Sequence, residues 1–150
     1  MTRVYVDMVG DLFHYGHVEF LRKARGFGDT LVVGVHSDAT AASYKRAPVM
    51  TMDERVWVVE ACRYVDEVIP DAPLEVAADW ISRHRIDLVV HGDDLDEQAT
   101  TLMYRVPREL GILRMVPYTQ GISSSEIRRR LYKGGPSQRQ AVEESRCYKR

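Results

Sequence analysis

The sequence predicts one α/β domain built on a doubly wound, mostly parallel five-stranded sheet with helices on both faces. The main observation is that short apolar runs alternate with segments whose apolar residues recur every three or four positions, as in successive βαβ units. A chain of 150 residues, 45% of them hydrophobic, is also long enough to bury one sizeable core. The charged fraction of 29% and the formal net charge of −1 are typical of a globular domain. They provide no overall basic field, so we expect neither a nucleic-acid partner nor a membrane-surface partner.

Five short apolar runs predict the strands, at residues 4–9, 30–36, 67–70, 87–91 and 113–116. The second and fourth runs are continuous enough to be buried on both faces of the sheet. In a doubly wound sheet, ligands bind beyond the carboxyl ends of the strands, where the strand order reverses. The loops expected to build a site therefore follow Val9, His36, His91 and Val116.

Helices are predicted between the strands, at residues 17–27, 52–62, 74–84 and 103–110, with a last helix after residue 123. Two helix starts fit the capping box, in which a hydroxyl and a carboxylate three residues later bond free backbone N–H groups. These pairs are Thr51 with Glu54 and Ser123 with Glu126.

The domain is expected to cover residues 1–133, because the Gly-Gly-Pro-Ser run at 134–137 ends the last helix. Residues 134–150 lack an apolar face and predict a linker-like basic tail, of the kind that leads to a further domain. From Ile122 onward the chain carries 8 Lys/Arg and 3 Asp/Glu, whereas residues 1–121 carry 13 and 19.

The two cysteines, Cys62 and Cys147, are too few for a disulfide framework and favour a reducing compartment. No apolar run approaches the ~20 residues of a membrane span, and the N-terminus has no signal-peptide pattern. We therefore expect a cytoplasmic protein without a membrane span.

The first motif with chemical content is His14-Tyr15-Gly16-His17, which follows the first strand and opens the first helix. Two imidazoles at this spacing can bind a metal, satisfy backbone groups, or hold a phosphate at the helix N-terminus. Zinc normally takes three or four protein ligands, and the nearest sulfur, Cys62, belongs to an amphipathic helix, so no protein metal site is expected. A helix N-terminus offers free N–H donors, and Gly16 lets a phosphate approach the backbone.

The second motif is the run Gly121-Ile122-Ser123-Ser124-Ser125 followed by Glu126 and three arginines, Arg128–Arg130. One interpretation is a well-capped surface helix with a solvated basic face. The other is a polyphosphate cradle, because hydroxyls and arginines at a helix start suit that ligand.

Together these motifs resemble the signatures of the HxGH nucleotidylyltransferases, and most closely the cytidylyltransferases that act on phosphoethanolamine, phosphocholine and glycerol 3-phosphate. The resemblance covers residues 3–132 and includes intermediate segments in the same order. These are Lys45, Val49-Met50, Glu54-Arg55, Arg63-Tyr64-Val65-Asp66-Glu67-Val68, His84-Arg85-Ile86-Asp87 and Gly92-Asp93-Asp94. The resemblance implies a Rossmann-like nucleotidylyltransferase fold and a CTP-dependent cytidylyltransferase of phospholipid or phosphonate biosynthesis.

The resemblance also implies roles for single residues. His14, His17 and Lys45 would be catalytic, stabilising charge on the phosphates during transfer. Nucleotide binding would further involve Val9, Gly10, Gly16, Arg63, Asp94, Thr119, Gly121, Ile122, Ser123, Ser124, Ser125 and Arg130. The stretch 63–68 lies at the dimer interface in relatives, which implies a homodimer. Mg²⁺ would be bound through the nucleotide phosphates rather than by a protein cage.

The departures from the family pattern concern the acceptor. Asp11, Leu74 and Tyr118 are expected to contact it. Leu74 stands where choline enzymes often have Trp, and no Tyr follows Asp94 closely, so the cage that a quaternary ammonium favours is lacking. Tyr118 stands where relatives have arginine, so a phosphate-binding cation is missing unless Arg114 or a tail arginine substitutes.

The predicted reaction transfers CMP from CTP to a small phosphorylated or phosphonylated alcohol and releases pyrophosphate. The acceptor would be like phosphoethanolamine, glycerol 3-phosphate or 2-hydroxyethylphosphonate, and choline phosphate would be the poorest. Two alternatives stay open: an adenylyltransferase of the same superfamily, which the stretch 63–66 disfavours, and a non-catalytic nucleotide-binding or nucleic-acid-binding module.

Overall fold

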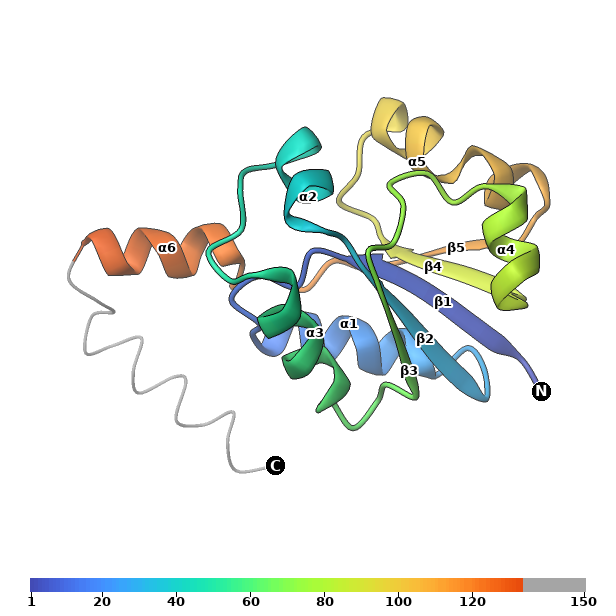
Figure 1. The fold of residues 1–150 in the computed structure, drawn as a ribbon, viewed down its shortest axis with the longest axis horizontal. Helices are drawn as coiled ribbons and strands as arrows, with labels where there is room; N and C mark the ends of the chain where they lie inside the picture. The colour runs from blue at the N-terminus through green and yellow to red at the C-terminus, as the bar shows by residue number, and fades with distance from the viewer. Residues whose placement is uncertain (134–150) are drawn as a thin grey trace.

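The computed structural model describes residues 1–133 (Figure 1). The predicted basic tail at 134–150 and Cys147 lie outside the described residues. In chain order the elements are β1 (Arg3–Met8), α1 (Tyr15–Arg25), β2 (Thr30–Val35), α2 (Asp38–Tyr44), α3 (Met52–Glu60), β3 (Glu67–Pro70), α4 (Ala78–His84), β4 (Leu88–Gly92), α5 (Glu97–Glu109), β5 (Leu113–Val116) and α6 (Ser124–Tyr132). None of the helices within this range is both long and apolar enough to cross a membrane.

The five strands form one sheet in the order β3-β2-β1-β4-β5, and all four pairings are parallel. The predicted fold class is therefore confirmed, with a sheet that is wholly rather than mostly parallel. The strand β1 lies at the centre, where Val4 pairs with Leu31 of β2 and with Leu88 of β4. Because the chain moves outward from β1 first on one side and then on the other, the strand order reverses between β1 and β4.

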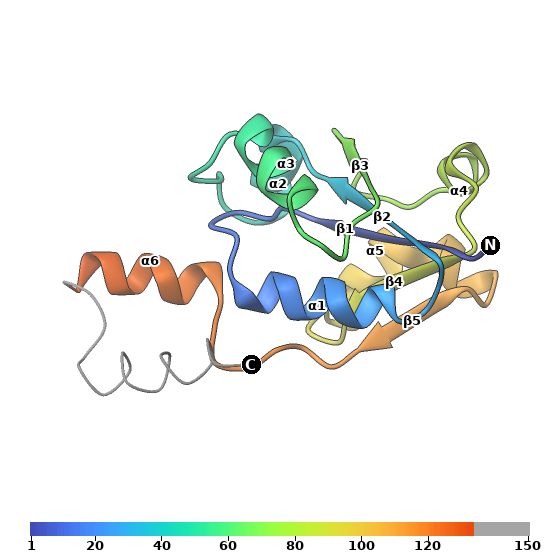
Figure 2. The same cartoon turned by 90° about the horizontal axis from the view of Figure 1, so that it is seen from below.

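Helices lie on both faces of the sheet (Figures 1 and 2). Each face has its own apolar core. On one face, Val6 and Val33 pack in a cluster with Leu21 of α1 and Val59 of α3. On the other face, Tyr5 of β1 packs with residues of α4 and α5. Alternate residues of β1 thus point to opposite cores, which explains why the run at 4–8 is buried throughout.

The helices differ from the predicted ones at several points. The helix α2 was not predicted, because its seven residues include no apolar period. Ser37 caps it by accepting a hydrogen bond from the Thr40 N–H. The helix α4 begins at Ala78 rather than at residue 74, and α5 begins at Glu97, where the Asp96 carboxylate caps it.

The two predicted capping boxes have different outcomes. Thr51 and Glu54 form the box in full, each side chain accepting a backbone N–H from the other residue. At α6, Ser123 accepts the Glu126 N–H, but the Glu126 carboxylate forms an ion pair with Arg129 instead of returning to Ser123. The second box is therefore only half formed, because a charged partner on the next turn competes for the carboxylate.

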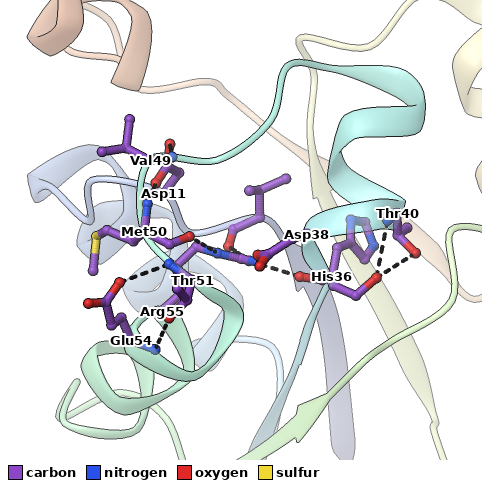
Figure 3. A network of polar contacts seen from close by, with 11 residues as sticks. Asp11, His36, Asp38, Thr40, Val49, Met50, Thr51, Glu54 and Arg55 are labelled. Atoms are coloured by element: carbon purple, nitrogen blue, oxygen red, sulfur yellow. Dashed lines mark hydrogen bonds and ion pairs between the residues drawn. The ribbon is translucent and has the colours of Figure 1, made fainter.

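The side chain of Arg55 in α3 joins the carboxyl ends of two strands (Figure 3). It is fully buried, and its guanidinium donates to the carbonyls of Val9 after β1, His36 after β2, and Met50 before α3. It also bonds Asp38 Oδ1 at the start of α2 at 2.6 Å. Each buried carbonyl left without such a donor would cost about 1–3 kcal/mol, so this one side chain stabilises the ends of β1 and β2, which face the site.

Candidate functional site

A pocket of about 660 Å³ lies at the carboxyl edge of the sheet, around the point where the strand order reverses. Its wall includes residues that follow β1, β2, β4 and β5, so all four loops expected from the sheet topology contribute to it. The volume suits a nucleotide or another small molecule.

Most of the predicted site residues line this pocket. They are Val9, Gly10, Asp11, His14, Gly16, His17, Lys45, Asp94, Tyr118, Thr119, Ser123, Ser124 and Ser125. Five predicted residues are not part of its wall, namely Arg63, Leu74, Gly121, Ile122 and Arg130.

The two histidines of the first motif cap the N-terminus of α1 reciprocally. The Gly16 N–H donates to His14 Nδ1 at 3.1 Å, and the His14 N–H donates to His17 Nδ1 at 3.1 Å. The rings lie close, with centroids 3.9 Å apart. A side chain at Gly16 would place its Cβ 2.8 Å from His14 Cε1, so the glycine is required for this packing as well as for access to the backbone. Of the three interpretations of the motif, the structure shows that the imidazoles satisfy backbone groups, and it places both rings in the pocket wall.

This capping determines the protonation of both rings. Because Nδ1 accepts a backbone N–H in each ring, a neutral imidazole there carries its proton on Nε2. Burial, the neighbouring His14 and Lys45 lower the pKa of His17 from its ordinary value of 6.5 to about 3, and burial lowers the pKa of His14. Both rings are therefore neutral Nε2–H donors near pH 7. The unfolded chain protonates His17 first as the pH falls, so its contribution to stability is full above pH 6.5 and decreases toward pH 3.

The carboxylate of Asp11 positions the segment between α2 and α3 (Figure 3). Its two oxygens accept the backbone N–H groups of Val49 and Met50 at 2.9 and 3.0 Å. The same segment carries Lys45, which lines the pocket and which ends α2 as its C-cap. Asp11 was expected as an acceptor contact, and the structure places it in the pocket wall with both oxygens already bonded to this segment.

Hydrogen bonds also join the start of α6 to Asp11 and to the segment between α2 and α3. The Ser124 hydroxyl donates to the Asp11 carbonyl at 2.7 Å, and Arg46 donates to the Ser125 hydroxyl. Gly121 has a φ of +88°, a left-handed conformation that glycine accepts readily and that turns the chain into α6. The N-termini of α1 and α6 thus open on one pocket, which combines two positive helix ends with hydroxyls, a setting of the kind that binds phosphate.

The pocket also reaches a buried polar cluster that was not predicted. Asp7, in β1, is 3% exposed, and the Tyr104 hydroxyl donates to its Oδ1. The second oxygen, Oδ2, has no hydrogen-bond partner among residues 1–133 and lies 3.9 Å from Nε2 of His36, which also lacks one. His36 Nδ1 lies 2.7 Å from the Tyr44 hydroxyl. Burial first and the Asp7 carboxylate second raise the pKa of Tyr44 and Tyr104, so both remain hydroxyl donors.

A signal for this cluster was present in the sequence. Asp7 is a charged residue inside an otherwise apolar strand, and such a residue is rarely buried without a partner. A buried carboxylate with an unused oxygen in a ligand pocket is a natural counter-ion for a small cation.

The predicted residues that do not line the pocket lie in the core or on the surface. Ile122 is 7% exposed and packs beside Gly16, and Leu74 packs against the core on the α4–α5 face. Arg63 is exposed after α3, and Arg130 lies beside the Glu126 carboxylate.

The described part of the chain contains no group of three or more His, Cys, Asp or Glu side chains arranged to hold a metal ion. The pocket wall around the two helix N-termini offers N–H groups, hydroxyls and cations, which suit phosphate oxygens.

Comparisons with known proteins agree with this geometry. A family model described as cytidylyltransferase-like matches residues 10–130. The chain is 45% identical over 133 residues to the ethanolamine-phosphate cytidylyltransferase of Dictyostelium discoideum, covering 85% of this chain and 37% of that protein. It is 45% identical over 135 residues to the Arabidopsis thaliana enzyme of the same name, covering 85% of this chain and 32% of that protein. It is 39% identical over 133 residues to choline-phosphate cytidylyltransferase A of Rattus norvegicus, covering 87% of this chain and 36% of that protein.

A solved structure, a lipopolysaccharide core biosynthesis protein from Thermoplasma volcanium, superposes with a TM-score of 0.66 at 25% identity, covering 81% of this chain and 99% of that one. The chain spans about a third of the length of the curated relatives it matches. Since the family model matches most of the residues and the motifs line one pocket, the chain belongs to the cytidylyltransferase-like family.

Proposed function

We propose that this domain transfers CMP from CTP to phosphoethanolamine or a closely similar phosphorylated amino alcohol and releases pyrophosphate. The observation that carries the proposal is that one pocket combines phosphate-binding groups with the buried, partly unpaired carboxylate of Asp7. An acceptor with a phosphate and a primary ammonium has the matching charges. The Dictyostelium and Arabidopsis relatives, named for ethanolamine phosphate, support this choice.

The acceptor side of the reaction requires little from the protein. A phosphate monoester has a second pKa near 6 and is largely dianionic at pH 7, so its oxygen can attack without a general base. The new bond forms between that oxygen and the α-phosphorus of CTP. The bond from the α-phosphorus to the bridging oxygen breaks, and pyrophosphate leaves with the electron pair.

The chain's own groups hold the two anions in line and stabilise the charge that develops. The Nε2–H groups of His14 and His17 donate toward the phosphates, and Lys45 supplies a positive charge. The hydroxyls and N–H groups at the start of α6, with Thr119, bind the triphosphate. Mg²⁺, held by phosphate oxygens and water, would neutralise part of the same charge.

Asp7 would bind the acceptor's ammonium through its unused oxygen. A quaternary ammonium has no N–H to donate to that oxygen, so choline phosphate would lose this hydrogen bond. The geometry thus favours a primary amine over choline.

We also propose that the protein is a cytoplasmic homodimer. The support is that α3, next to the stretch 63–68, leaves Trp57 78% exposed together with Val58, and such apolar surface is typical of a subunit interface. Light scattering of the purified chain is expected to give twice the 17.2 kDa chain mass, and a monomer at assay concentration would contradict the dimer.

The direct test of the proposed function is pyrophosphate release with CTP or ATP across a panel of acceptors. We expect CTP to give at least a tenfold higher kcat/KM than ATP, about 1.4 kcal/mol in transition-state binding. Phosphoethanolamine is expected to exceed glycerol 3-phosphate and 2-hydroxyethylphosphonate, with choline phosphate last. Preference for ATP would favour the adenylyltransferase alternative, and preference for choline phosphate would refute the role of Asp7.

A second prediction separates the capping role of His17 from its role in catalysis. His17→Asn retains an acceptor near Nδ1 but loses the Nε2 donor, so stability should change little while kcat falls by ~10²-fold or more. His17→Gln retains a donor near Nε2 but loses the cap acceptor, so it should lose about 1 kcal/mol of stability and keep more activity. Urea unfolding and steady-state kinetics of both variants measure this, and the opposite order of activities would show that the ring is only structural.

A further inference from the structure

Arg128, in α6, lines the pocket, whereas the sequence motif treated it only as one of three successive arginines and assigned a role to Arg130 alone. Its Nη1 is buried and has no hydrogen-bond partner among residues 1–133. A buried donor without a partner costs roughly 1–3 kcal/mol, more when it is charged, so such a group in a native pocket indicates a ligand that supplies the missing acceptor.

The neighbouring arginines of α6, Arg129 and Arg130, are both bonded to a carboxylate of the same helix. Arg129 Nε donates to Glu126 Oε2 at 2.7 Å, and Arg130 Nε lies 3.4 Å from Glu126 Oε1. The one carboxylate of this helix therefore serves both of these residues. Arg128 forms no ion pair with it and is directed to the pocket wall.

Position 118, where the family pattern has a phosphate-binding arginine, is a tyrosine in this chain. The pocket therefore lacks a cation that Arg128 can replace. Burial and the neighbouring Asp94 raise the pKa of Tyr118, so its hydroxyl carries no charge at neutral pH. Arg114, which was considered as a substitute, is exposed on β5, donates to the carbonyls of Gly111 and Leu113, and does not line the pocket.

We propose that Arg128 binds the β- and γ-phosphates of the nucleotide and so holds the pyrophosphate that leaves. This inference rests on the proposed function for the identity of the nucleotide. The serines at 123–125 form the start of α6 and Arg128 lies one turn further along it, whereas the histidines lie at the start of α1. A triphosphate whose α-phosphate lies beside the histidines can extend its terminal phosphates to α6. Arg128 there meets the charge that moves onto the leaving oxygen as the α–β bond breaks.

The test is calorimetric binding of CTP, CMP and inorganic tripolyphosphate to the wild-type chain, Arg128→Gln, Arg128→Lys and the matched control Arg129→Gln. Arg128→Gln should weaken CTP and tripolyphosphate by about tenfold or more, and leave CMP within about twofold, because CMP lacks the terminal phosphates. Arg128→Lys should recover part of the loss, and Arg129→Gln should bind all three ligands like the wild type.

Thermal unfolding without ligand provides the control for folding. Since Arg128 Nη1 has no partner among residues 1–133, Arg128→Gln should melt no lower than the wild type, whereas a merely structural residue would lower the melting temperature. Unchanged CTP affinity in Arg128→Gln, or an equal loss for CMP, would overturn the inference. A wild-type chain that binds ATP as tightly as CTP would refute the proposed function instead, and the tripolyphosphate result would still decide the role of Arg128.

Discussion

The backbone groups at the carboxyl edge of the sheet need hydrogen-bond partners, and this constraint shapes the site. Parallel strands end here with carbonyls exposed, and α1 begins here with free N–H groups. Arg55 bonds the carbonyls that follow β1 and β2, and Asp11 bonds the N–H groups of the segment before α3. His14 and His17 bond two N–H groups at the start of α1. The side chains that bond these backbone groups thus also fix the positions of the side chains and loops that line the pocket.

As a result, the hydrogen-bond donors that His14 and His17 present to the pocket are fixed in position. Each histidine uses Nδ1 for the backbone and keeps Nε2–H for a ligand, and the lowered pKa values prevent a switch of protonation state near pH 7. Under the proposed function, these preorganised neutral donors and Lys45 would stabilise phosphate charge without reorganising during the reaction. The buried carboxylate of Asp7 would add the opposite charge and so distinguish the two ends of a zwitterionic acceptor.

Much of the fold followed from the sequence, because apolar periodicity and parallel pairing leave few arrangements. The loops after Val9, His36, His91 and Val116 all reached the pocket as the topology required. The helix α2 could not be predicted, because it is short and depends on the Ser37 cap and on the bond from Arg55 to Asp38. Within the site, local motifs identified the groups at the starts of α1 and α6. The charge of Asp7 in an apolar strand was a signal for the buried cluster, but its neighbours His36 and Tyr44 depend on contacts between β1, the residue after β2 and α2 that no local pattern specifies.

The backbone N–H of His14 holds His17 as a neutral Nε2–H donor. The most direct measurement is ¹⁵N–¹H NMR of the imidazole nitrogens of the ¹⁵N-labelled chain, followed from pH 7.5 to pH 5. We predict that His17 keeps the Nε2–H tautomer with an unprotonated Nδ1 throughout this range, because its pKa is lowered to about 3. An Nδ1–H tautomer, or a titration near the ordinary pKa of 6.5, would contradict the account.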